Sequence, residues 1–171
     1  MRNDGIKNIV TGGVTAGLYV LLTLVSFAFG LASGAVQLRL SEALCILPAF
    51  TPAAIPGLFA GCILANIITG CALPDIVFGS LATLLGAIGT RALRKYVLKD
   101  ARNFSGTLLS LLPPILLNTL TVTALQVFVY GIKAGRILIA LSVFAGEFVS
   151  CGVFGWVLKR YIVSNKQKLG F

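Results

Sequence analysis

Negative charge and metal-binding side chains are scarce in this sequence. Its 171 residues include no histidine and only five Asp or Glu, and its four cysteines form no Cys-x-x-Cys pair. Zinc and dithiol chemistry therefore have no residues to support them. The sequence also lacks the Gly-x-x-x-x-Gly-Lys-Ser/Thr loop that binds phosphate in many nucleotide hydrolases. We predict no catalytic residue, no metal and no cofactor, and we interpret the cysteines as small core residues.

Apolar residues dominate instead. They make up 57% of the chain, and the mean hydropathy is +0.98. Apolar stretches of about 20 residues, bounded by charge or by Gly and Pro, indicate helices that cross a bilayer. The sequence has six such stretches, at residues 7–30, 36–50, 52–69, 74–98, 105–131 and 134–161. We therefore predict an all-α membrane protein in which residues 1–171 form a single domain of six transmembrane helices.

Three of these stretches differ from the simplest pattern. The second is short for a full crossing, and the third has Pro52 and Pro56 near its start, where a missing N–H costs little. We expect both helices to be tilted or shielded by their neighbours. The first stretch is longer than the roughly 7–15 apolar residues of a signal peptide, so we expect a retained helix and no cleavage.

The 14 basic residues divide unevenly between the two ends of such a bundle. With six crossings, Arg39 lies within the membrane, and Lys133 and Arg136 fall on one side. Both termini and eleven basic residues fall on the other side: Arg2, Lys7, Arg91, Arg94, Lys95, Lys99, Arg102, Lys159, Arg160, Lys166 and Lys168. Cytoplasmic loops carry the excess of Lys and Arg, so both termini are predicted to be cytoplasmic. The net charge of +9 then mainly reflects the orientation of the chain in the membrane. The sequence predicts no soluble domain that could bind nucleic acid.

Ionisable side chains interrupt the apolar stretches at four positions, which are Arg39, Glu42, Asp75 and Glu147. A charge inside a bilayer is costly, so such residues usually face a protein interior or a cavity and bind something. On an inward-running second helix, Glu42 lies one turn, roughly 4.5 Å, deeper than Arg39. Glu147 lies about 15 Å deep, near the bilayer centre. Asn118 reaches a comparable depth and Gln126 lies nearer the outer end, so one polar pocket can collect these groups.

Small residues form a second pattern, in the first helix. Gly12 and Ala16 are one turn apart, and so are Gly13 and Gly17. Pairs of this kind let a second helix approach closely. The partner helix can belong to another subunit, or the pattern can reflect ordinary packing within the bundle.

Several segments together resemble the QueT family, the substrate-binding S components of energy-coupling factor (ECF) vitamin transporters. The most specific is VQLRLSEAL at 36–44, and the others are LP at 47–48, TPAAIPG at 51–57, DIVFGSLAT at 75–83 and GE at 146–147. The resemblance covers nearly the whole chain. It implies a six-helix S-component bundle in the bacterial cytoplasmic membrane that captures queuosine precursors, the 7-deazaguanines. It also implies two kinds of partner, a transmembrane T subunit and two ATPase subunits.

The resemblance also implies roles for particular residues. S components dock through an Ala-xxx-Ala motif on the first helix, which corresponds here to the small residues Gly12, Gly13, Ala16 and Gly17. The pocket is expected near the outer face, closed by a lid at about 31–35. Glu147 is our first candidate for the N1–H and 2-amino donor edge of a deazaguanine, because charge-assisted bidentate pairs are strong. Arg39 or Asn118 would donate to O6. The full set of substrate-binding candidates is Glu147, Glu42, Arg39, Asn118, Gln37, Gln126, Asp75 and Phe78.

Each candidate has a plain structural alternative. Arg39 and Glu42 can form an i,i+3 ion pair. Asp75 can cap the fourth helix. Asn118 can satisfy backbone groups loosened by Pro113 and Pro114. Phe78 is one of eleven phenylalanines that could stack on a base.

Two other functions stay open at this point. The chain could be an S component for another flat, partly polar vitamin. It could also be a solitary secondary transporter that uses Glu147 or Glu42 as a proton carrier. A membrane enzyme is the weakest interpretation, because no nucleophile–base pair or metal set is evident.

Overall fold

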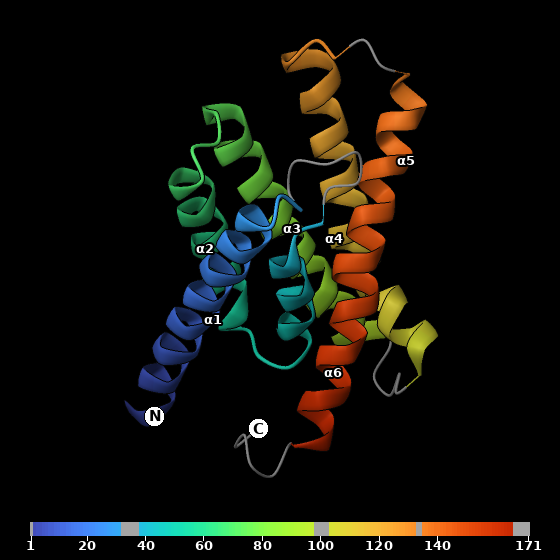
Figure 1. The fold of residues 1–171 in the computed structure, drawn as a ribbon. Helices are drawn as coiled ribbons and strands as arrows, with labels where there is room; N and C mark the ends of the chain where they lie inside the picture. The colour runs from blue at the N-terminus through green and yellow to red at the C-terminus, as the bar shows by residue number, and fades with distance from the viewer. Residues whose placement is uncertain (1, 32–37, 98–102, 133–134, 166–171) are drawn as a thin grey trace.

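The structure, a computed structural model, describes residues 2–31, 38–97, 103–132 and 135–165. This part of the chain is helical and contains no strand (Figure 1). Six helical segments follow one another: α1 (Arg2–Ala28); η1 (Leu40–Ala49); α2 (Ala54–Ile68); η2 (Asp75–Gly79), α3 (Ser80–Ala92) and η3 (Leu93–Val97); α4 (Phe104–Ala124) and η4 (Leu125–Val129); and α5 (Arg136–Glu147), η5 (Phe148–Val153) and α6 (Phe154–Ser164). The prediction of an all-α membrane-type bundle is confirmed.

The six segments differ in their reach. Four are long and apolar enough to cross a membrane, namely those within 5–28, 75–95, 104–129 and 136–164. The other two, η1 and α2, are shorter. The second segment also differs in kind from the expected helix at 36–50, because it is a 3₁₀ helix of 10 residues with Pro48 inside it. Arg39 precedes this helix in an extended conformation, so the expected step of one α-helical turn from Arg39 to Glu42 is wrong.

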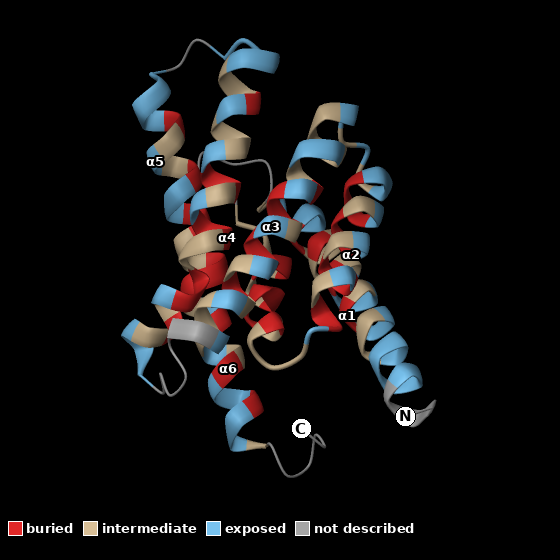
Figure 2. Ribbon diagram, turned by 180° about the vertical axis from the view of Figure 1, so that it is seen from behind, coloured by how far each residue is buried: buried red, intermediate tan, exposed pale blue. Residues whose placement is uncertain are grey.

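The short η1 lies at the centre of the bundle. It contacts α1, α2, α3, α4, η5 and α6, and Figure 2 shows the buried residues concentrated around it. Six of its ten residues are buried. Cys45, Cys62 and Cys151 are buried and unoxidised in the same core, which agrees with their interpretation as small core residues. Because protein surrounds η1, it has no need to span the lipid on its own.

Close contacts at glycines join the helices around η1 in pairs. A Cβ at Gly57 on α2 would lie 2.5 Å from the carbonyl oxygen of Gly12 on α1. A Cβ at Gly86 on α3 would lie 2.7 Å from Pro114 Cα on α4. Both contacts are too short for any larger residue, so α1 packs on α2 and α3 packs on α4 through small residues.

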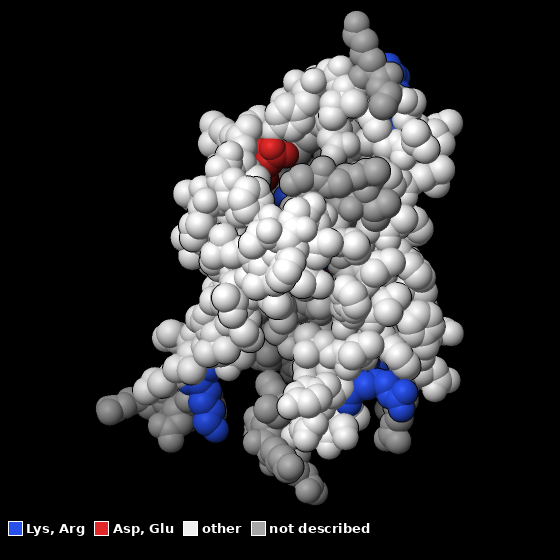
Figure 3. All heavy atoms as spheres, viewed as in Figure 1, with Lys and Arg blue, Asp and Glu red and all other residues white. Residues whose placement is uncertain are grey.

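The two ends of the molecule differ in charge. Both chain ends lie at the same end of the bundle (Figure 1), and the blue patches of Lys and Arg in Figure 3 gather mostly there. The long flanks between the ends carry exposed apolar side chains such as Ile9, Leu120 and Ile137. This distribution suits a protein embedded in lipid. The positive-inside rule would place the basic end of such a protein in the cytoplasm.

Candidate substrate-binding site

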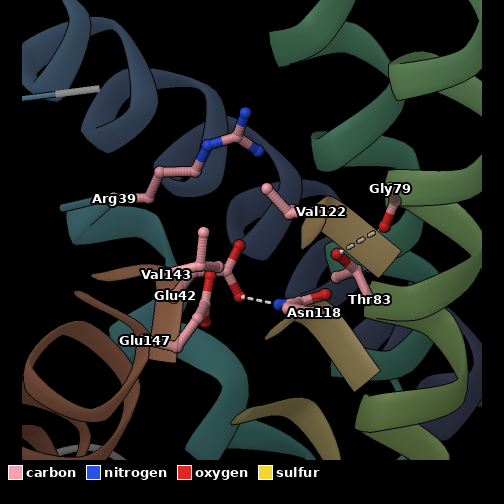
Figure 4. A pocket seen from close by; sticks show the side chains of 8 residues that line it. All are labelled: Arg39, Glu42, Gly79, Thr83, Asn118, Val122, Val143 and Glu147. Atoms are coloured by element: carbon pink, nitrogen blue, oxygen red, sulfur yellow. Dashed lines mark hydrogen bonds between the residues drawn. The ribbon is translucent and has the colours of Figure 1, made fainter. Parts of the chain in front are cut away.

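A cavity inside the bundle brings together side chains from four helical segments (Figure 4). Arg39 and Glu42 come from the start of η1, Gly79 and Thr83 from η2 and α3, Asn118 and Val122 from α4, and Val143 and Glu147 from α5. Three of these segments each contribute two residues four apart, which places both on one helix face. The cavity therefore contains two carboxylates, one guanidinium and one amide within an apolar frame.

Glu42 is buried, and both of its carboxylate oxygens accept hydrogen bonds from the protein. Its Oε1 accepts from the hydroxyl of Tyr19 at 2.5 Å, and its Oε2 accepts from Asn118 Nδ2 at 3.1 Å and from Cys45 Sγ at 3.2 Å. Hydrogen bonds of this kind compensate a buried carboxylate for the loss of water. Glu42 thus ties α1 and α4 to η1 and has little capacity left for a ligand.

Glu147 is in a different state. It is 7% exposed, and its buried Oε2 has no hydrogen-bond partner among the residues that the structure describes. It ends α5 immediately before the π-helical turn of η5, and such turns are frequent at functional sites. An unpaired buried acceptor costs about 1–3 kcal/mol, more when it is charged. Because this oxygen belongs to a residue that lines the cavity, a ligand N–H can satisfy it.

Arg39 supplies positive charge to the same cavity. No ion pair or hydrogen bond joins its guanidinium to Glu42 or to any other described residue. Figure 4 shows the side chain directed away from both carboxylates. The i,i+3 ion pair offered as the structural alternative for Arg39 and Glu42 is therefore not formed, and the guanidinium is available to an acceptor.

Asn118 is oriented by its neighbour. Its amide nitrogen donates to Glu42, so its carbonyl oxygen faces the other way, toward Thr83 in Figure 4. Its amide nitrogen therefore does not bond to the backbone groups freed by Pro113 and Pro114, which was the structural alternative for this residue. In this orientation Asn118 offers the cavity an acceptor. Glu42 takes one of the two Asn118 amide N–H groups, so the second N–H and Arg39 are the donors left for O6.

The remaining described candidates, Asp75, Phe78 and Gln126, lie outside the cavity lining. Asp75 accepts a hydrogen bond from the hydroxyl of Tyr130, which lies just beyond η4. This bond raises the pKa of Tyr130 to about 12. The Asp75 side chain makes no helix-capping hydrogen bond, which was its structural alternative. Phe78 is 53% exposed, and Gln126 is half-buried in η4. Gln37 and most of the expected lid at 31–35 lie outside the described residues.

Sequence reasoning missed Tyr19, Gly79 and Thr83. The signal for Tyr19 was present: a tyrosine in the middle of an apolar helix is unusual, because membrane tyrosines favour the lipid–water interface. Its side chain is 1% exposed. Thr83 Oγ1 donates to Gly79 O at 3.1 Å and contacts Cys62 Sγ at 3.5 Å. Both residues fall within the 75–83 segment, but nothing in the sequence marked them as cavity residues.

The four small residues of α1 separate into two faces. Gly12 and Ala16 pack against α2: a Cβ on Gly12 would lie 3.2 Å from Ala53 O, and one on Gly61 would lie 3.0 Å from Ala16 Cα. Gly13 and Gly17 are exposed, and a Cβ on either would meet nothing within 4 Å. The first pair therefore packs the bundle, and the second pair lies on an open, otherwise apolar surface.

Lipid-exposed helices around an enclosed polar cavity define a class, that of helical membrane proteins that handle a small polar molecule. The family model described as QueT transporter matches residues 9–164, so the chain belongs to the QueT transporter family. It is accordingly a membrane transporter protein. No curated protein and no solved structure matches the chain significantly.

Proposed function

We propose that this protein is the substrate-capturing S component of an ECF-type importer for a queuosine precursor, a 7-deazaguanine. The observation that carries the proposal is the unpartnered Glu147 oxygen in a cavity that also contains Arg39. Membership of the QueT transporter family supports it. The protein would act in the bacterial cytoplasmic membrane with both termini in the cytoplasm.

The chemistry of a 7-deazaguanine suits the groups that the cavity leaves free. Its N1–H and 2-amino group form two parallel donors, which one carboxylate can accept together, and Glu147 has the capacity for this. Its O6 requires a donor, and the Arg39 guanidinium makes no hydrogen bond or ion pair to the described residues. Another donor of the base can reach the carbonyl oxygen of Asn118. Glu42 would hold the site together and leave recognition to these three residues.

Energy for uptake would come from partners. The chain has no phosphate loop of the Gly-x-x-x-x-Gly-Lys-Ser/Thr type, so we propose that a T subunit and two ATPase subunits supply it. The open face of α1 at Gly13 and Gly17 is the proposed docking surface for the T subunit, because small residues allow close helix approach.

Reconstitution in liposomes tests the proposed coupling. The purified chain should bind 7-aminomethyl-7-deazaguanine but accumulate it only when T and ATPase subunits and ATP are present. Accumulation against a gradient by the chain alone, abolished by a protonophore, would overturn this and favour a solitary proton-coupled transporter. Failure to bind any 7-deazaguanine, with binding of another vitamin, would favour an S component of different specificity.

Substitutions on the two faces of α1 test the proposed docking surface. Gly17→Leu should abolish uptake by the full complex while leaving ligand affinity within about twofold, because the added side chain meets only the partner. Val14→Leu, at an exposed position of the same helix, is the matched control and should transport normally. Ala16→Leu should instead reduce binding and stability together, because Ala16 packs against Gly61. Normal uptake by Gly17→Leu would remove the docking role.

A further inference from the structure

Helix α1 contributes one side chain to the network behind the cavity. Tyr19 does not line the cavity itself, but its buried hydroxyl donates to Glu42 Oε1 at 2.5 Å. Tyr19 also belongs to the buried apolar core, together with Leu44 and Cys62. A tyrosine hydroxyl buried this deeply needs a polar partner. Here the partner is a carboxylate of the site.

The two oxygens of Glu42 are held from opposite sides of the bundle. Tyr19 of α1 fixes Oε1, and Asn118 of α4 donates to Oε2. A carboxylate is planar, so fixing one oxygen sets the direction in which the other accepts. The orientation of the Asn118 amide, and therefore the position of its carbonyl oxygen at the cavity, depends on the Tyr19 hydroxyl.

A second contact on the same face of α1 provides a comparison. One turn after Tyr19, the Thr23 hydroxyl lies 2.8 Å from the backbone carbonyl oxygen of Tyr19 and 2.9 Å from Ser41 Oγ, and Thr23 is 4% exposed. The bond to Ser41 also joins α1 to η1 through a buried hydroxyl. Thr23 contacts Tyr19 only at the backbone, and neither of its two hydrogen bonds involves the Tyr19 hydroxyl, Glu42 or Asn118.

We propose that Tyr19 is a positioning residue for the binding site, which acts through Glu42 to keep the Asn118 carbonyl oxygen facing the ligand. The ligand part of this proposal rests on the proposed function, whereas the link itself is a property of the fold. Tyr19 is on the helix that carries Gly13 and Gly17. A displacement of α1 at that open face would therefore alter the orientation of an acceptor in the cavity.

Calorimetric titration with 7-aminomethyl-7-deazaguanine tests the ligand part. Tyr19→Phe keeps the ring and removes only the hydroxyl, and it should weaken binding about 3- to 10-fold, the range expected for one hydrogen bond. Thr23→Val, the matched control, should change the affinity less than about twofold. It should lower the unfolding temperature by about as much as Tyr19→Phe does. Equal affinity changes in the two variants, or none in Tyr19→Phe, would overturn the positioning role.

A double-mutant cycle on thermal unfolding tests the link without any ligand. Tyr19 and Asn118 share only Glu42, so the unfolding temperatures of Tyr19→Phe, Asn118→Ala and the double variant should be non-additive by about 2–4 °C. Thr23→Val combined with Asn118→Ala should be additive. Asn118→Ser, a smaller loss of packing, repeats the cycle if the alanine variant is too unstable.

The two arms separate the proposals. Additive Tyr19 and Asn118 effects would overturn the positioning role even if the ligand binds as proposed. A wild-type protein that binds no 7-deazaguanine would overturn the proposed function, and the cycle would still decide the role of Tyr19.

Discussion

The two carboxylates of the cavity, Glu42 and Glu147, share a location but differ in their hydrogen bonds. Both are nearly completely buried, at 2% and 7% exposure. Glu42 accepts from Tyr19, Asn118 and Cys45, whereas one oxygen of Glu147 accepts from nothing. A carboxylate whose acceptor positions are filled by the protein can only support structure. One with a free oxygen costs stability in the empty site and can recover that cost when a donor arrives.

This difference explains why two similar residues should have opposite effects when they are changed. Glu42 belongs to the framework that joins α1, η1 and α4, and Glu147 belongs to the recognition surface. The same reasoning applies to Arg39, which has no described partner and so falls on the recognition side. Four substitutions break or sharpen this comparison.

The largest effect is expected for Glu147→Gln. It replaces one acceptor oxygen with an NH2 group that faces the donors of the ligand, so affinity for 7-aminomethyl-7-deazaguanine should fall by about 1.5–3 kcal/mol, or roughly 10- to 150-fold. The unfolding temperature of the empty protein should stay the same or rise, because an unpaired buried charge is removed. Calorimetry and thermal unfolding measure the two quantities. An unaltered affinity in the folded variant would move recognition elsewhere.

The ligand offers a control for that substitution. In the wild type, 7-deazahypoxanthine, which lacks the 2-amino group, should bind more weakly than 7-deazaguanine. In Glu147→Gln the two bases should bind within about threefold of each other, because the carboxylate that reads the 2-amino group is gone. Retention of the full wild-type preference would show that another group reads this edge.

Glu42→Gln should affect stability first. The change leaves three donors facing one remaining oxygen and one new donor, so the unfolding temperature should fall by roughly 3–12 °C. The preference between 7-deazaguanine and 7-deazahypoxanthine should persist in the protein that stays folded. A stable Glu42→Gln protein with its ligand preference lost would reverse the roles assigned to the two carboxylates.

Arg39→Lys should weaken ligand binding by a smaller factor and leave the stability of the protein unchanged. The lysine keeps the positive charge but loses the planar fork of donors. Affinity for 7-aminomethyl-7-deazaguanine should fall by about 3- to 10-fold, and the unfolding temperature should not change, because the guanidinium makes no hydrogen bond to the described residues. A large loss of stability would instead place Arg39 in the framework.

The smallest effect is expected at Cys45. Its thiol gives Glu42 the weakest of its three hydrogen bonds. Cys45→Ala should lower the unfolding temperature by about 1–3 °C and leave affinity unchanged. A larger shift than that of Tyr19→Phe would indicate that the thiol, and not the tyrosine hydroxyl, is the main support of Glu42.

Much of the fold could be predicted from the sequence, because the thickness of the apolar bilayer core sets both the length of an apolar stretch and the length of the helix that it forms. The long apolar stretches correspond to the four long helices, and α2 ends at Ile68, one residue before the predicted limit. The 3₁₀ form of η1 could not be predicted in this way. It depends on Pro48 and on the helices that surround the segment, and periodicity is uninformative in so short a stretch.

The candidate site was partly predictable for a related reason. The cost of charge in a bilayer singled out Arg39, Glu42 and Glu147, and all three line the cavity. The same rule also selected Asp75, which instead bonds to Tyr130 outside the cavity lining. Hydrophobicity identifies which residues need partners. It does not identify the partners, which are determined by tertiary packing.

The most direct test of the account is the structure of the protein with 7-aminomethyl-7-deazaguanine bound. We expect the Glu147 carboxylate within hydrogen-bond distance of the N1–H and 2-amino groups of the base. Glu42 should still accept from Tyr19 and Asn118. A base held by Glu42 in place of those two donors, or bound away from Glu147, would contradict the division between a framework carboxylate and a recognition carboxylate.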